Sequence, residues 1–106
     1  MAEFFNAAVK NVDVVETPLF TSTSDSTIVL SILCANTDGV ESVDVTAINR
    51  DSSSNDEGYL GFTITVPANS NFDILGNKYI LPSGNSISVS SSISGYLDVQ
   101  ASYVVV

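Results

Sequence analysis

The stretch Ile28-Val-Leu-Ser-Ile-Leu-Cys34 is the most apolar run of the 106-residue sequence, and it decides the fold class. Alternate side chains of an extended chain share one face, which would bring together Ile28, Leu30, Ile32 and Cys34. The residues between them are also mostly apolar, as in strands that are covered on both sides. We therefore expect residues 27–35 to form a central β-strand, buried on both faces or nearly so.

Apolar segments on either side of this run recur at intervals of about ten residues, with Gly, Pro, Asn and Ser between them. Strong helix formers are sparse and scattered, so no helix is expected. The expected strands are residues 9–16, 27–35, 41–49, 59–66, 71–75, 78–81, 86–92 and 96–106, with residues 19–20 as a further extended segment. This pattern predicts an all-β fold, a two-sheet antiparallel β-sandwich of jelly-roll-like form with about eight short strands. Residues 1–8 are expected to be an N-terminal arm ahead of a single sandwich domain, residues 9–106.

The charge balance excludes two classes of partner. Twelve acidic residues stand against three basic ones, and the formal net charge is −9. Binding to nucleic acid depends on neutralising several phosphates, and docking on anionic lipid needs clusters of Lys or Arg. We therefore expect no nucleic-acid partner and no membrane partner.

The composition also removes most catalytic chemistry. The chain has no histidine, so its serines and threonines lack their commonest general base. A Ser–Lys pair would have to use Lys10 or Lys78, both expected at exposed strand starts. Paired carboxylates could catalyse glycosyl transfer, but a solvated acidic surface is the simpler interpretation. No Gly-rich loop opens a helix, so no nucleotide cofactor is expected, and the sequence predicts a protein that is not an enzyme.

Two further features are interpreted as structural. Cys34 is the single cysteine, which rules out an internal disulfide and favours a small buried hydrophobe over a reactive thiol. The polar segment 51–58 carries oxygen ligands, but Ser53 and Phe62 occupy positions where the calcium-loop pattern needs an Asp or Asn and a Glu. We expect an exposed loop there and no metal site.

Exposed apolar residues at the two ends of the chain are the candidate partner-binding site. Phe4 and Phe5 are costly to leave in water, so they either fold back under the sandwich or anchor on a neighbouring subunit. Adjacent residues of a strand point to opposite faces, so at least one residue of the terminal Val104-Val105-Val106 faces away from the core. A covering strand or a neighbouring chain would hide it.

Five motifs follow one another along the chain: TPLFT at residues 17–21, STIVLSILCANT at 26–37, VPANS at 66–70, ILPSGNSI at 80–87 and GYLDVQASY at 95–103. In this order they resemble small virion structural proteins of tailed bacteriophages, in particular phages of marine bacteria and cyanobacteria. The resemblance implies a small β-sandwich that acts as a capsid decoration (cement) protein or as a head, neck or tail accessory. It implies the major capsid protein or another virion protein as partner, allows a homo-oligomer, and carries over no catalytic residue.

The location that follows is the outer surface of the capsid, where an acidic protein lies away from packaged DNA. The start of the chain has neither the basic nor the long apolar segment of a signal peptide, so we expect synthesis in the host cytoplasm. A different function remains open, a carbohydrate-binding or adhesin-like module of a tail or neck fibre. Its stacking platforms would be Tyr59, Tyr79, Tyr96 or Tyr103.

Overall fold

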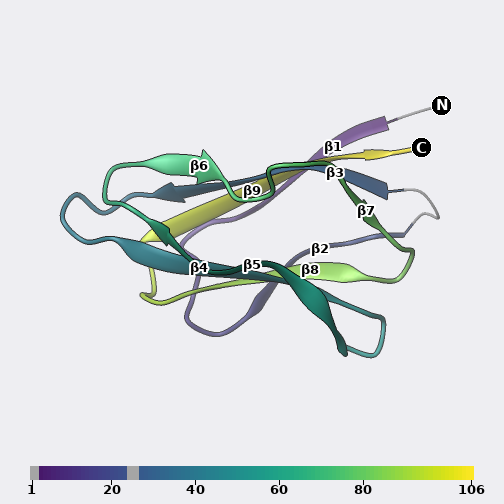
Figure 1. Cartoon of the computed structure of the whole chain (residues 1–106), viewed down its shortest axis with the longest axis horizontal. Helices are drawn as coiled ribbons and strands as arrows, with labels where there is room; N and C mark the ends of the chain where they lie inside the picture. The colour runs from purple at the N-terminus through teal and green to yellow at the C-terminus, as the bar shows by residue number, and fades with distance from the viewer. Residues whose placement is uncertain (1–2, 24–26) are drawn as a thin grey trace.

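Two antiparallel β-sheets pack face to face in the computed structural model, which describes residues 3–23 and 27–106 (Figure 1). The strands are β1 (Glu3–Val9), β2 (Thr17–Thr21), β3 (Thr27–Asn36), β4 (Val43–Arg50), β5 (Asp56–Val66), β6 (Asn71–Asp73), β7 (Tyr79–Leu81), β8 (Ser86–Ser91) and β9 (Leu97–Val105). The described residues include no helix. The all-β sandwich expected from the sequence is confirmed, with nine strands where about eight were expected.

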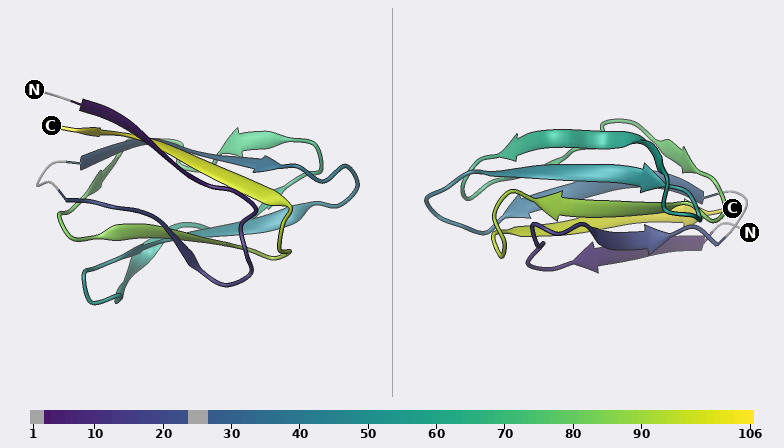
Figure 2. Two further views of the ribbon diagram at one scale, coloured as in Figure 1. Left: turned by 180° about the vertical axis from the view of Figure 1, so that it is seen from behind. Right: turned by 90° about the horizontal axis from the view of Figure 1, so that it is seen from below.

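The strand order is that of a jelly roll. One sheet has the order β1-β9-β3-β6 with β7 also on β3, and the other has the order β2-β8-β4-β5. The short strands β6 and β7 pair with opposite ends of β3, at Leu33–Ala35 and Thr27–Val29, so together they fill one strand position. Four positions in each of two sheets give the eight-stranded double-sheet arrangement of jelly rolls (Figures 1 and 2).

The core fills the space between the sheets, and we call the faces that line it the inner faces. It consists of Val12, Leu19, Phe20, Val29, Ile32, Cys34, Val43, Val45, Ala47, Val66, Leu81, Ile87, Val89, Leu97, Val99 and Ala101. Most of these residues are β-branched or small, and they alternate with more exposed ones along their strands. This alternation is the period-2 pattern that predicted the sandwich.

The expected phase of the central strand is wrong in its first half. The register between β3 and β9 shifts between Val29 and Ser31, which makes Leu30 the extra residue of a β-bulge. Beyond the bulge Ile32 and Cys34 lie in the core as expected, but before it the core residue is Val29 and not Ile28. One inserted residue therefore turns Ile28 and Leu30 to the outer face, where both are half-buried.

The first expected strand, residues 9–16, is also wrong. Residues 10–16 form bends and irregular backbone, whereas the strand β1 lies in the segment that was expected to be an arm. Asn11 has a φ of 55°, which ends the extended chain. Val12 then inserts into the core, and its N–H donates to the Leu97 carbonyl over 2.7 Å. Residues 1–2 of the expected arm lie outside the described residues.

The other expected strands are present with ends shifted by a few residues. Residues 19–20 lie within β2, and the strands expected at 41–49 and 59–66 correspond to β4 and β5.

Buried polar side chains tie the two sheets together. Asn49 of β4 donates from Nδ2 to the Tyr79 hydroxyl of β7 over 2.7 Å, and its Oδ1 accepts from Asn85 over 3.0 Å. Asn36 of β3 donates from Nδ2 to the Val66 carbonyl of β5 over 3.0 Å. A buried polar group must be paired to avoid a desolvation cost, so these contacts fix how the sheets sit on one another.

Candidate interaction surface

Four apolar residues form a line across the outer face of the five-stranded sheet, close to the described ends of the chain. The register pairs Phe4 with Val104, Val104 with Ile28, and Ile28 with Ile80. Directly opposite residues of antiparallel strands point to the same face, so we call these four residues the outer row. Phe4 is 75% exposed and Ile80 is 69% exposed, whereas Val104 between them is only 7% exposed.

Phe4 and Phe5 point to opposite sides of β1. The ring of Phe5 lies on the inner side and stacks on Tyr103, with centroids 5.5 Å apart. Tyr103 in turn stacks on Phe20 of the other sheet, so three aromatic rings from β1, β9 and β2 form one aromatic stack. Phe5 remains 42% exposed at the open end of this stack. The two phenylalanines therefore behave differently. Phe5 packs on the sandwich, which was one of the two alternatives, whereas Phe4 is exposed to solvent and free to contact a partner.

The three terminal valines also differ. Val104 belongs to the outer row and is buried by its neighbours, although it is not part of the core between the sheets. Val105 is half-buried and lines a pocket on the inner side, and Val106 is exposed beside it. As expected from the alternation, at least one valine, Val104, faces away from the core.

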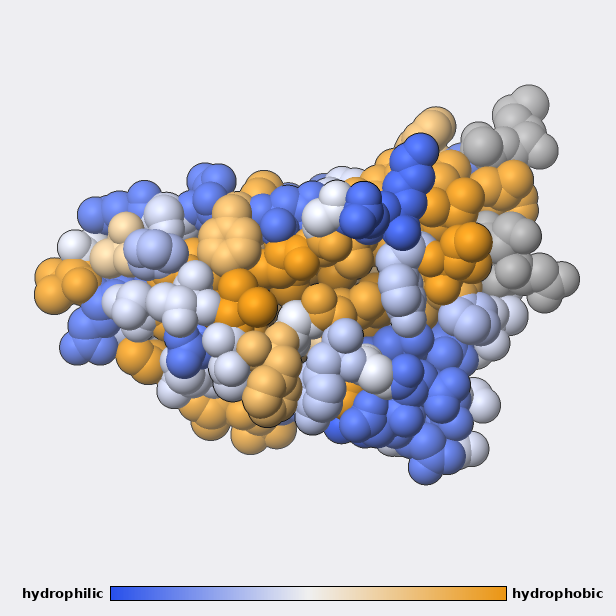
Figure 3. All heavy atoms as spheres, viewed as in Figure 1, coloured by the Kyte–Doolittle hydropathy of each residue, from blue (hydrophilic) through white to orange (hydrophobic). Residues whose placement is uncertain are grey.

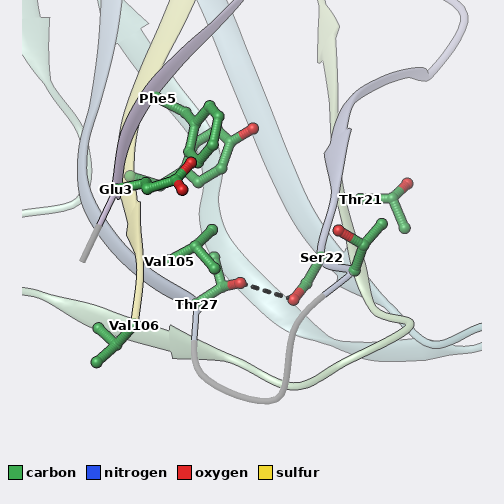
Figure 4. Close-up of a pocket in the computed structure, with 9 residues that line it drawn as sticks. Glu3, Phe5, Thr21, Ser22, Thr27, Val105 and Val106 are labelled. Carbon is green, nitrogen blue, oxygen red and sulfur yellow. Dashed lines mark hydrogen bonds between the residues drawn. The ribbon is translucent and has the colours of Figure 1, made fainter. Parts of the chain in front are cut away.

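The pocket opens between the edges of the two sheets and has a volume of about 350 Å³. Figure 4 shows Phe5, Glu3 and Val105 on one wall and Thr21 on the other. Between them the hydroxyls of Ser22 and Thr27 lie 2.8 Å apart, in hydrogen-bond contact. Among the lining residues that the structure describes, Glu3 carries the one side-chain carboxylate. These residues offer apolar walls and hydroxyls, and they include no acid–base pair.

The rest of the described structure offers little for catalysis. Residues 3–23 and 27–106 contain no group of three or more His, Cys, Asp or Glu side chains placed to hold a metal ion. Cys34 is fully buried, and this burial, with a smaller contribution from the charge of Asp73, raises the pKa of its thiol to about 12. Cys34 is therefore a core residue, as the sequence predicts, and not a nucleophile.

In the polar segment 51–58, the carboxylate of Asp51 forms hydrogen bonds with backbone N–H groups of the same segment. Asp51 accepts hydrogen bonds from the N–H groups of Ser53 and Asn55, each over 2.9 Å, and the pKa of Asp51 is lowered mainly by the Asn55 contact. The first half of the segment is the loop between β4 and β5, and β5 begins at Asp56. This is the local turn chemistry of an Asx motif.

An ion pair lies on the outer face of the four-stranded sheet. Arg50 at the end of β4 donates from Nε to Glu16 Oε2 over 2.6 Å and from Nη2 to Oε1 over 2.9 Å. This contact is the main reason that the pKa of Glu16 is lowered. The charge of Arg50 is thereby balanced by Glu16, and the other two basic residues of the chain are Lys10 and Lys78.

A second exposed aromatic group lies on the four-stranded sheet. Tyr59 and Phe62 of β5 are both exposed and make an edge-to-face contact with centroids 4.7 Å apart. Tyr59 lies opposite Ile48, which is buried. The other three tyrosines that were considered as sugar platforms, Tyr79, Tyr96 and Tyr103, are half-buried and packed against the core.

The hydropathy of the surface separates these regions (Figure 3). Hydrophobic residues gather at the end of the five-stranded sheet where β1 begins and β9 ends, and hydrophilic residues cover the region of the β4–β5 loop. Within the described residues there is no helical segment with the length and hydropathy that a membrane crossing requires.

Of the four residues in the outer row, Phe4 and Val104 were among the candidates expected from the sequence, whereas Ile28 and Ile80 were not. Ile28 was assigned to the core because the bulge at Leu30 leaves no mark in the sequence. Ile80 could have been found from the sequence, because it alternates with Tyr79 and Leu81 in a three-residue strand and therefore points to the face opposite to theirs.

The chain matches no protein-family model, and no curated protein matches it in sequence. Solved structures share its fold. They include the T13 viral particle of infectious bursal disease virus (TM-score 0.57, 5% identity) and the VP2 subviral particle of that virus (TM-score 0.56, 6% identity). A third is the Gx strain of the virus (TM-score 0.53, 8% identity). These matches cover 97%, 98% and 99% of this chain but 30%, 33% and 33% of the solved chains, so the chain spans about a third of their length. The fold of this chain is thus one that is also found in the particles of a virus.

Proposed function

We propose that this chain is a non-enzymatic structural protein of a virus particle, which binds the outside of a tailed-bacteriophage capsid as a decoration, or cement, protein. The observation that carries the proposal is the outer row, an apolar line on the outer face of a jelly-roll sheet whose two end residues, Phe4 and Ile80, are exposed. The fold shared with chains of infectious bursal disease virus particles supports it. The sequence resemblance to phage virion proteins supports the more specific role.

The partner we propose is the major capsid protein or another virion protein, with Phe4 as the main anchor and Val104 beside it on the outer face. Phe5, Val105 and Val106, which line the neighbouring pocket, are proposed as further contacts. Burial of an exposed Phe or Ile side chain contributes roughly 1.5–3 kcal/mol, whereas an exposed ion pair contributes about 0–1 kcal/mol. Apolar contacts through Phe4 and Ile80 therefore outweigh charged ones in a chain whose 12 acidic residues face only three basic ones. The same acidity suits a position on the outer surface, away from packaged DNA.

A cement protein stabilises the shell because it binds the assembled lattice and not the separated subunits. At a hundredfold excess over Kd this linkage amounts to ~2.7 kcal/mol per site. Particles that carry the protein should therefore release their DNA at a higher temperature than particles that lack it, measured by a dye that reports free DNA. Equal release temperatures would contradict the cementing role.

Site-directed variants test the anchor. The double variant Phe4→Ser, Ile80→Ser removes the two exposed members of the outer row and should weaken attachment to particles at least tenfold. Far-UV circular dichroism and Tm should change little, because neither side chain belongs to the core. Val15→Ser is the control, since Val15 is an apolar residue of similar exposure that lies outside the outer row. Equal attachment of the double variant and the control would contradict the outer row as anchor.

A second candidate function rests on Tyr59 and Phe62. An exposed aromatic pair on the outer face of a sheet is the kind of platform on which a sugar ring stacks, as in a carbohydrate-binding or adhesin-like module of a tail or neck fibre. A glycan array would decide for this function if it gave hits that Tyr59→Ala abolishes and Phe4→Ser leaves intact. An array without hits would eliminate it.

A further inference from the structure

The unpaired backbone at the edges of the two sheets differs in how well it is protected. The edges are formed by β1 and the β6/β7 position in one sheet, and by β2 and β5 in the other. An edge strand presents free N–H and C=O groups to any extended chain, and soluble proteins normally block such edges with short strands, prolines, charges or bulges. Each edge can be compared with that list.

Three of these edges are blocked. The strands β6 and β7 have three residues each. Strand β2 contains Pro18, and its register with β8 shifts directly after that residue. Strand β5 has three register shifts against β4, and Thr63 within it has a φ of 49°. None of these strands offers a regular row of backbone groups to a partner.

Strand β1 is the exception among the described edges. Its residues pair with β9 without a register shift, from Glu3 opposite Val105 to Val9 opposite Val99. The strand is seven residues long and contains no proline, lysine or arginine. Its single charge, Glu3, lies at one end. In the left view of Figure 2, β1 is the strand of its sheet nearest to the viewer, and no other strand lies in front of its unpaired edge. This is the geometry in which edge-to-edge pairing occurs.

We propose that β1 pairs antiparallel with β1 of a second copy of this chain, about a two-fold axis that passes beside Asn6. In such a pair the residue at the axis faces its own copy, so the numbers of opposite residues add up to 12. Asn6 is the midpoint of Glu3–Val9, and this register therefore pairs every residue of the strand.

The side chains of β1 complement each other in this register. The large residues Phe4 and Phe5 lie in the first half of the strand, and the small residues Ala7 and Ala8 lie in the second half. Phe4 is placed opposite Ala8 of the partner subunit, and Phe5 opposite Ala7 of the partner subunit. Each bulky ring thus lies beside a methyl group, and the half-exposed ring of Phe5 gains cover.

The neighbouring registers fit less well. An axis beside Phe5 would place the two bulky Phe5 side chains directly opposite each other. An axis beside Ala7 would place Phe4 opposite a lysine, residue 10. The size pattern of the strand therefore selects Asn6.

Charge determines how such a dimer responds to salt. The two copies of Glu3 would lie six residues apart along the seam, about 20 Å at roughly 3.4 Å per residue. This separation exceeds the ~8 Å screening length at physiological salt, so they do not oppose each other directly. Two chains of net charge −9 nevertheless repel as wholes, and added salt should therefore strengthen the dimer.

The dimer also deepens the proposed function. A two-fold axis perpendicular to the sheet keeps both outer rows on the same face of one continuous sheet. The two anchors then bind as one bivalent unit, which raises overall affinity without any new contact. This consequence rests on the proposed function, whereas the pairing of β1 does not.

The test uses charge at the axis. Asn6 is exposed, and Asn6→Lys and Asn6→Glu each place two like charges directly across the seam. Sedimentation analysis over a range of protein concentrations should show dimers for the wild type and at least tenfold weaker association for either variant alone. An equimolar mixture of the two variants should restore dimers, because opposite charges then meet.

The matched control is Gln100→Lys, which adds the same charge on the same face but one strand inside the edge. It should associate like the wild type. A wild type that stays monomeric up to millimolar concentration at high salt would overturn the proposal, as would variants that associate as strongly as the wild type. Ile80→Ser separates this proposal from the proposed function, since it should weaken attachment to particles and leave the dimer intact.

Discussion

The rings of Phe20 and Tyr103 lie parallel to within 2°, with their centroids 4.2 Å apart, and they connect the two sheets. Phe20 comes from β2 of the four-stranded sheet, and Tyr103 comes from β9 of the five-stranded sheet. With Phe5 also stacked on Tyr103, the three rings bridge the two sheets at the side of the sandwich where β1 and β2 are the edge strands.

Removal of the central ring contact should cost much of the stability. Phe20 is buried, and Phe20→Ala should lower the free energy of unfolding by about 3–5 kcal/mol, as is typical for large-to-small changes in a core. Phe5→Ala removes the outer ring of the same stack and should cost clearly less, because Phe5 is already half exposed. Urea denaturation followed by circular dichroism measures both, and equal losses would contradict this account.

The hydrogen bonds between the sheets should depend mainly on Asn49, which contacts both Tyr79 and Asn85. Asn49→Ala leaves both the Tyr79 hydroxyl and the Asn85 amide without their partner, and each buried unpaired group costs about 1–3 kcal/mol. Tyr79→Phe removes one of the two contacts and should cost less. Thermal unfolding would show this as a lower Tm for Asn49→Ala than for Tyr79→Phe. The reverse order would mean that packing of the Tyr79 ring, and not the hydrogen bonds, joins the sheets.

The Glu16–Arg50 ion pair predicts a pH dependence. Because the hydrogen bond from Arg50 lowers the pKa of Glu16 in the folded state below its ordinary value of 4.5, the unfolded state binds the proton more readily. The contribution to stability is present above pH 4.5 and is lost as the pH falls through the folded-state pKa. Glu16→Gln should therefore lose less stability than the wild type between about pH 5 and pH 3.

The size of this effect is small, since partly exposed ion pairs contribute about 0–1 kcal/mol and are weakened by salt. Glu41→Gln is the control, because it makes the same change of charge at another exposed glutamate. A Glu16→Gln profile that coincides with those of the wild type and of Glu41→Gln would show that the ion pair contributes nothing to stability.

Cys34 provides a probe of opening. With its pKa raised to about 12, only about one thiol in 10⁴ is ionised at pH 8, and the side chain is fully buried. A thiol-reactive dye should therefore label the native protein only as fast as it unfolds, and should label it at once in denaturant. Rapid labelling of the native protein would mean that β3 is accessible without global unfolding.

The sequence predicts those elements well in which apolar alternation and tertiary packing agree. The strand at 41–49 alternates cleanly, and it forms β4 with Val43, Val45 and Ala47 in the core. Strand β1 was missed because Phe4-Phe5 and Ala7-Ala8 are adjacent pairs that give no period of two. Residues 9–16 were expected to be a strand because Val12 to Val15 resembles one locally, but the left-handed conformation of Asn11 and the docking of Val12 on β9 are tertiary effects.

The candidate site is harder to predict because it is assembled from four strands. Phe4, Ile28, Ile80 and Val104 are far apart in sequence, and only the pairing register brings them into one line. The bulge at Leu30 decides that Ile28 joins this line and does not enter the core. Such a bulge depends on how β3 meets β9, and no local propensity encodes it.

The pairing of the first and last strands also determines how the protein responds to mechanical tension. Glu3 lies opposite Val105, so β1 and β9 present their chain ends at the same end of the ladder. A force that pulls the two ends of the chain apart would load the seven residue pairs of this ladder one after another, as a zipper opens. A force transmitted through the broad face of the sheet would instead load the pairs together. The protein should therefore unfold at a low force when it is pulled by the two ends of the chain, and at a higher force when the load is spread over the face of the sheet.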